Sequence, residues 1–246
     1  FGSRCCSSRF AGKFQFRALM LITVASLLLP PISMLALSQV GLSRKWHRVD
    51  KLLSWCASLA RCGSGVFVAK AARAKVKSNS ASRLVLYEYE GCPFCRRVRE
   101  TLTVLNLDCM IRPCPRPTFD ATAVEVVKQG GSRYRPIVLA AGKLQVPFLV
   151  DNAADPPVSM YESRAIIAYL WREYGGSSMP LSYRIPGSEL AALVSTFVAS
   201  LLRSQPRMGL LRMPSKQPAD DSLELWSFES HPKCRLVRET LCVLEL

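Results

Sequence analysis

Two cysteines three positions apart, Cys92 and Cys95, have the residue type and spacing for thiol chemistry. Residues 84–89 read as a short buried strand, and Pro93 is a residue favoured at the first position of a helix. Cys92 is therefore expected at a helix N-terminus, where unsatisfied N–H groups and the helix dipole stabilise a thiolate. We predict that Cys92 is the attacking thiol and that Cys95, one turn later, resolves a mixed disulfide.

The charges that follow the two cysteines are basic. Arg96, Arg97 and Arg99 lie within the next two turns and are expected to favour a thiolate further. A zinc half-site is the alternative for a C-x-x-C pair, with Cys109 and Cys114 as the remaining ligands. The C-x4-C spacing with two prolines is not that of a zinc knuckle, so no metal is expected and these two cysteines are predicted to be buried.

The composition excludes several other functions. The chain has 33 Lys and Arg against 18 Asp and Glu, but residues 1–83 hold 14 of the basic residues and one acid. Residues 84–246 therefore carry a net charge of only +2, which does not favour nucleic-acid binding by the folded part. Only two histidines occur, too few for a His-based zinc site or a Ser-His-Asp hydrolase. The ten cysteines are irregularly spaced, unlike those of a small disulfide scaffold.

The segment 1–83 is predicted to be a largely disordered targeting leader or a membrane anchor. Residues 18–43 carry no charge and are long enough to cross a bilayer, but Pro30 and Pro31 interrupt them. Residues 44–83 are basic and rich in Ser and Ala, as in an organelle transit peptide. An uncharged segment followed by a basic, Ser- and Ala-rich segment resembles the two-part plastid leader of algae. The alternative is a membrane anchor with a basic flank.

Residues 84–176 are predicted to form a small α/β domain with a mixed sheet. The expected order is strand, helix, strand, helix, strand, strand, helix. The expected strands are 84–89, 109–111, 146–151 and 158–160. One helix is expected to begin at Pro93, and the others are expected over 121–129, 133–140 and 163–174.

The sequence also contains an internal repeat. Aligning residues 84–107 with residues 223–246 gives 14 identical positions in 24. Residues 219–246 are therefore predicted to be the start of a second, truncated repeat that lacks the strands to bury its apolar face. His231 stands there in place of Cys92, and Cys234 in place of Cys95. Residues 177–218 are predicted to be a linker with an amphipathic helix over 189–203.

The segment 84–175 resembles the thioredoxin-fold N-terminal domain of glutathione S-transferases and the related glutaredoxins. The resemblance rests on Cys92-Pro93-Phe94-Cys95, on residues 145–151 (QVPFLVD) and on residues 160–163 (MYES). It is closer still to plant and algal plastid proteins with two such domains in tandem. Residues 116–132 depart from the family as an insertion, and no all-helical domain follows residue 176.

The resemblance implies a glutathione site built from four residues. Pro147 would follow a cis peptide bond, and the backbone of Val146 would pair with the cysteinyl part of glutathione. Glu162 and Ser163 would hold its γ-glutamyl end. Ser163 is expected to cap the last helix, whose N-terminus suits a carboxylate.

The function expected from these residues is a glutathione-linked thiol–disulfide oxidoreductase, with glutathione as co-substrate and protein disulfides as further partners. A non-catalytic glutathione-binding or assembly module is one alternative, and a glutathione transferase is the other. The leader favours a plastid location. Membrane contact, if the leader is retained, would be through residues 18–43.

Overall fold

The computed structural model describes residues 44–69, 84–115, 132–176, 186–203 and 223–246. All of them belong to the unit that begins at Ser43. Several predictions lie outside these residues: the uncharged stretch 18–43, the helix over 121–129 and all but the last residue of the insertion 116–132. None of the described helices is long and apolar enough to cross a membrane.

Four strands form one mixed sheet in the order β2-β1-β3-β4. They are β1 (Leu84–Glu88), β2 (Met110–Pro113), β3 (Phe148–Asp151) and β4 (Val158–Tyr161). β1 pairs in parallel with β2 and antiparallel with β3, and β3 pairs antiparallel with β4. This mixed α/β sheet with its helices is consistent with a thioredoxin-like fold and confirms the predicted fold class.

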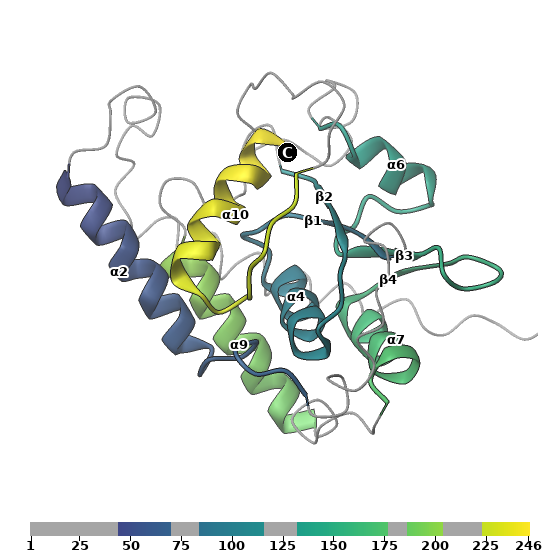
Figure 1. The fold of residues 1–246 in the computed structure, drawn as a ribbon, viewed down its shortest axis with the longest axis horizontal. Helices are drawn as coiled ribbons and strands as arrows, with labels where there is room; N and C mark the ends of the chain where they lie inside the picture. The colour runs from purple at the N-terminus through teal and green to yellow at the C-terminus, as the bar shows by residue number, and fades with distance from the viewer. Residues whose placement is uncertain (1–43, 70–83, 116–131, 177–185, 204–222) are drawn as a thin grey trace, which may run out of the picture. The chain divides into compact units, whose positions relative to one another are not determined.

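Helices cover both faces of the sheet (Figure 1). On one face, α4 (Pro93–Leu105) and α7 (Ser163–Tyr174) pack on Leu86 and Leu149. On the other face, Val138 of α6 (Arg135–Ala140) packs with the aromatic rings of β1 and β3. The alternation of side chains along a strand directs Leu86 to one core and Tyr87 to the other. The sheet is thus buried on both sides.

Three further helices lie beside this domain: α2 (Arg44–Ala60), α9 (Pro186–Leu202) and α10 (Pro232–Leu244). α2 packs on α9 and α10, and Ser54 and Ala57 of α2 are fully buried. The hydroxyl of Ser58 donates to Ser230 O at 2.6 Å. Residues 44–69 are therefore part of the folded unit, whereas the sequence predicts a largely disordered segment as far as residue 83.

The second repeat forms its helix but not its strand. Residues 223–228 have no strand pairing, and α10 follows after a turn, as α4 follows β1. Leu223 and Leu225 are exposed, whereas their counterparts Leu84 and Leu86 are buried. An apolar strand needs neighbouring strands to bury it. Residues 223–228 therefore lack the neighbours that bury β1.

α2 and α9 end in similar sequences, which lie outside the aligned segments 84–107 and 223–246. Residues 54–61 read SWCASLAR and residues 196–203 read TFVASLLR. Arg61, after α2, donates to both carboxylate oxygens of Glu100 in α4 at 2.8 and 2.6 Å. Arg203, after α9, donates in the same way to Glu239 in α10 at 2.8 and 2.5 Å. Each of these two helices is therefore followed by an arginine that binds a helix later in the chain, Arg61 binding α4 and Arg203 binding α10.

Ion pairs also join residues 84–107 to residues 223–246. They form a buried charge cluster, which we define as Glu88, Glu90, Arg99, Glu229 and Arg238. Arg99 Nε donates to Glu229 at 2.9 Å, and Arg238 Nε donates to Glu90 at 3.2 Å. In the alignment Arg99 corresponds to Arg238, and Glu90 corresponds to Glu229. The arginine of each aligned segment therefore binds the glutamate of the other. The cluster also contains pairs within each segment, Arg99 with Glu88 and Arg238 with Glu229, so that each buried charge has a partner of opposite sign.

Candidate functional site

The turn between β1 and α4 places Cys92 where the sequence predicts it. Cys92 is the N-cap of α4, with φ −74° and ψ 122°, and Pro93 is the first residue of the helix. The backbone N–H of Cys95 donates to Cys92 Sγ at 3.4 Å. The sulfur therefore takes the role that a capping hydroxyl or carboxylate has in other helices.

The two thiols have opposite pKa shifts. Burial raises the pKa of Cys92, but hydrogen bonds from the Cys95 thiol and from the N–H groups of Cys95 and Phe94 lower it by more, so that it ends below its ordinary value. Burial and the neighbouring Cys92 raise the pKa of Cys95 well above its ordinary value. Such a pair has one sulfur suited to attack and one that stays protonated until it is needed.

The three arginines after the cysteines do something different from what the sequence predicts. Arg99 pairs with Glu88 and Glu229, Arg97 pairs with Glu189 at 3.6 Å, and Arg96 lies 4.0 Å from Glu229. Their charges are thus opposed by carboxylates, and hydrogen bonds at the helix start lower the pKa of Cys92 instead. Burial raises the pKa of Glu88 to about 7, although Arg99 lowers it.

The strand register brings the other predicted residues to the end of the sheet where β1 finishes. Tyr87 of β1 is opposite Phe148 of β3, and Phe148 is opposite Tyr161 of β4. Pro147 immediately precedes Phe148, and Glu162 immediately follows Tyr161. Cys92 follows β1 at this same end. The peptide bond between Val146 and Pro147 is cis, as the resemblance implies.

The start of α7 corrects one prediction. Ser163 is not the N-cap; it is the first helical residue, and Glu162 is the N-cap. Glu162 has a φ of 65°, and its side chain makes no capping bond to the helix. Its carboxylate accepts a hydrogen bond from Gln145 Nε2 at 2.7 Å. Gln145, which directly precedes Val146 in the sequence motif, is therefore a site residue to which no role was assigned from the sequence.

α9 adds contacts that the sequence did not indicate. Glu189 pairs with Arg97 of α4 at 3.6 Å and with Arg164 of α7 at 3.3 Å. It thereby links the helix that begins at the dithiol to the helix that begins after Glu162. The Phe94 ring packs edge-on against Phe197 of α9, with centroids 5.6 Å apart. Cys92 is 3% exposed in this arrangement.

The second repeat keeps the geometry of this turn without its attacking thiol. His231 is the N-cap of α10, and its Nδ1 accepts a hydrogen bond from Cys234 N–H at 3.2 Å. The backbone angles of His231, φ −73° and ψ 118°, match those of Cys92. Histidine can cap a helix, but it cannot form a mixed disulfide.

The remaining cysteines suit packing. Cys109 is partly buried and Cys114 is fully buried, as predicted, and burial raises the pKa of both, that of Cys114 to about 12. Cys242 of α10 is buried and accepts a hydrogen bond from Glu90 N–H at 3.4 Å. Within the described ranges there is no group of three or more His, Cys, Asp or Glu side chains that could hold a metal ion.

Comparison with known proteins gives one match. Residues 86–178 match the family model of the glutathione S-transferase N-terminal domain. The matched segment begins within β1, extends beyond β4 and contains all six predicted site residues. No curated protein and no solved structure matches the chain significantly. The match supports a glutathione-related function in general.

Proposed function

We propose that the chain is a glutathione-linked thiol–disulfide oxidoreductase that uses Cys92 and Cys95. The observation that carries the proposal is the opposite shift of the two thiol pKa values at the start of α4. An acidic sulfur at a helix N-cap followed one turn later by a protonated sulfur is the arrangement that dithiol exchange requires. The family match supports glutathione as the co-substrate.

The proposed reaction exchanges sulfur–sulfur bonds without any other oxidant. The Cys92 thiolate attacks the glutathione sulfur of a mixed disulfide, so that a Cys92–glutathione disulfide forms and the substrate leaves as a thiolate. Cys95 then loses its proton and attacks Cys92, which forms the Cys92–Cys95 disulfide and releases glutathione. Two further glutathione molecules reduce that disulfide and leave as oxidised glutathione. Alternatively, a second glutathione attacks the first mixed disulfide directly.

The proposed glutathione-binding site is the end of the sheet where β1 finishes and α4 and α7 begin. The backbone of Val146, before the cis bond to Pro147, would pair with the cysteinyl part of the tripeptide. The exposed Glu162 would accept the α-ammonium group, and the N–H groups at the start of α7 would receive the α-carboxylate. The plastid location is a proposal that rests on the composition of the segment 1–83.

The test is the reduction of a small glutathione mixed disulfide by the full chain with glutathione as reductant. Cys92→Ser should abolish turnover. Cys95→Ser should retain turnover, because a second glutathione can resolve the intermediate. Cys62→Ser is the matched control, since Cys62 is exposed and distant in sequence from α4, and it should leave the rate unchanged.

Two results would count against the proposal. Unchanged turnover in Cys92→Ser would show that this thiol does not react. A wild-type chain that binds glutathione in calorimetry, but reduces the mixed disulfide no faster than the uncatalysed rate, would instead identify a glutathione-binding module. The low exposure of Cys92 makes this second measurement necessary.

A further inference from the structure

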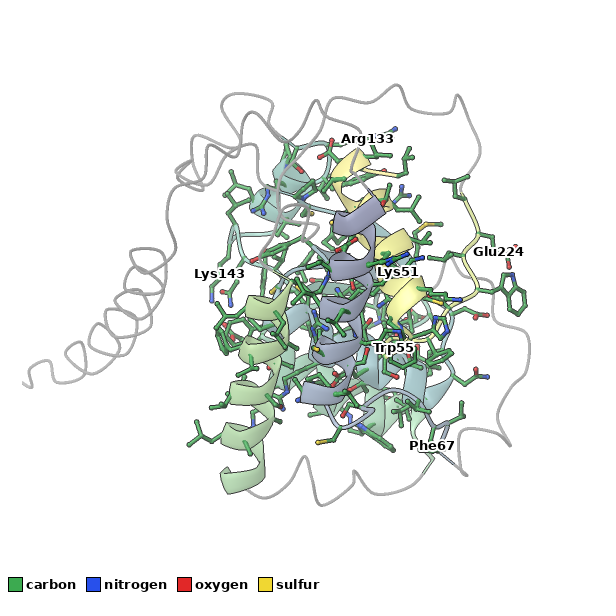
Figure 2. The ribbon with its side chains drawn as sticks, turned by 90° about the vertical axis from the view of Figure 1, so that its left-hand side faces the viewer. Lys51, Trp55, Phe67, Arg133, Lys143 and Glu224 are labelled. Carbon is green, nitrogen blue, oxygen red and sulfur yellow. The ribbon has the colours of Figure 1, made fainter. Side chains whose placement is uncertain are left out.

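α2 and α9 together present an apolar surface that nothing in the described chain covers. Arg61 at the end of α2 contacts Ala192 near the start of α9, and Arg203 at the end of α9 contacts Asp50 near the start of α2. The two helices therefore run antiparallel and side by side. Figure 2 shows them at the front of the molecule, with Trp55 and Lys51 labelled along α2.

The buried side of each helix carries small or polar side chains. Ala57 of α2 and its counterpart Ala199 of α9 are fully buried, and serines or threonines flank both. The large apolar side chains point the other way and are between 42% and 72% exposed. They form what we call the α2/α9 face: Val49, Leu52, Trp55, Leu59, Leu190, Val194, Val198 and Leu201.

An amphipathic linker helix is expected to bury its apolar side chains, whereas α9 exposes several of them. The apolar stripe of α9, with Leu190, Val194 and Leu201, would ordinarily pack on the protein, but these side chains are more than half exposed. The apolar stripe of α9 reaches the end of α2, where Ala60 of α2 and Val194 of α9 line the same shallow depression. An apolar patch of this extent marks an interaction surface.

The charges around the α2/α9 face have one sign. Among the described side chains of α2 and α9, the exposed charged residues are Arg48 and Lys51. The two carboxylates are held in ion pairs: Asp50 with Arg203 at 2.7 Å, and Glu189 with Arg97 and Arg164. The surface is thus apolar with a basic border.

We propose that the α2/α9 face docks on an anionic lipid surface. An apolar helix face that contains Trp and Leu and has Lys or Arg at its border binds the interface of such membranes. Basic side chains near the surface strengthen such binding through their attraction to the negative lipid charge. In a second copy of this chain, the same face would bring Arg48 and Lys51 towards like charges. α2 also follows directly after the uncharged residues 18–43, which favours a lipid partner.

The test uses the full chain with vesicles of phosphatidylglycerol and phosphatidylcholine, the latter brominated on its acyl chains. Bromine quenches tryptophan fluorescence only at short range. Trp55→Phe should reduce the quenched fluorescence at least twofold. Trp226→Phe is the matched control, because Trp226 is exposed on the segment before α10, and it should leave the quenching unchanged.

A second pair of variants tests the face as a whole. The double variant Leu52→Glu, Val194→Glu should remove the quenching that depends on Trp55. Val237→Glu, at an exposed apolar position of α10, should not. Both altered positions of the double variant are exposed, and an unchanged circular dichroism spectrum would confirm that it folds.

Three outcomes would overturn the proposal. If Trp55→Phe leaves the quenching unchanged, any membrane contact is through other parts of the chain. Equal quenching in vesicles of phosphatidylcholine alone would remove the role of anionic lipid. If light scattering without lipid gives twice the chain mass, and the double variant restores the single mass, the partner is a second copy.

Discussion

Glu229→Gln should lower the free energy of unfolding by about 3 kcal/mol at pH 7, because the negative charge of Glu229 holds the buried cluster together. Its carboxylate accepts from Arg99 Nε at 2.9 Å and pairs with Arg238 at 3.0 Å. Burial alone would raise its pKa, but Arg238, Arg99 and Arg96 lower the pKa from 4.5 to about 2. A pKa change of one is worth about 1.4 kcal/mol, which gives the predicted loss.

The sign of the pH dependence follows from the lowered pKa. A carboxyl whose folded pKa lies below its unfolded pKa stabilises the fold above the unfolded value, and this contribution disappears as the pH falls through the folded value. Above pH 4.5 the free energy of unfolding of the wild type should therefore exceed that of Glu229→Gln by the full amount, about 3 kcal/mol. The difference should shrink between pH 4.5 and pH 2, because the wild-type carboxyl becomes protonated there.

Urea denaturation followed by circular dichroism measures both quantities. Glu173→Gln is the matched control, since Glu173 pairs with Arg172 on the surface, where both side chains are largely exposed. That variant should change the free energy of unfolding by less than about 0.5 kcal/mol. A loss below about 1 kcal/mol for Glu229→Gln at pH 7, or a difference from wild type that does not depend on acid pH, would refute the reasoning.

Two further predictions concern the dithiol. The thiolate absorbance of Cys92 near 240 nm should titrate with a midpoint below the ordinary value of 9.0, and Cys92→Ser should lack this step; a midpoint at or above 9.0 would contradict the lowered pKa. Phe197→Ala should speed the alkylation of Cys92 by iodoacetamide several-fold, because the Phe197 ring packs on Phe94 and holds α9 against the start of α4. Leu201→Ala, an exposed position on the same helix, serves as the control and should leave the rate unchanged; equal rates in both variants would show that α9 does not limit access.

Much of the domain could be predicted from local sequence. The strand β1, the turn and the start of α4 at Pro93 follow from an apolar run, a glycine and a proline within ten residues. α7 spans the residues predicted for it, Ser163–Tyr174, because its apolar positions have helical spacing and glycines follow. The cap of α7 was misplaced, because a Glu at φ 65° is a conformation that local preference does not favour.

The dithiol and the N–H groups at the helix start that lower the pKa of Cys92 could both be found from the sequence, but the partners of the nearby arginines could not. Counting charges near Cys92 added a further effect of Arg96, Arg97 and Arg99, whose charges are opposed by carboxylates in the structure. Their partners include Glu229, 130 residues after Arg99, and Glu189 in α9. Contacts over such separations depend on how the repeats pack, which residue spacing does not reveal.

The sequence by itself determined β1, α4 and α7, the position of the dithiol at a helix start and the identities that link β1–α4 to residues 223–246. Each of these depends on residues within one or two turns of each other, or on direct identity. Only the tertiary structure decided that α2 belongs to the fold, that α9 buries its small polar side and exposes its apolar one, and that the repeats share a buried charge cluster. The physical reason is that a buried charge needs a partner of opposite sign, and the partners of these charges lie far away in the sequence.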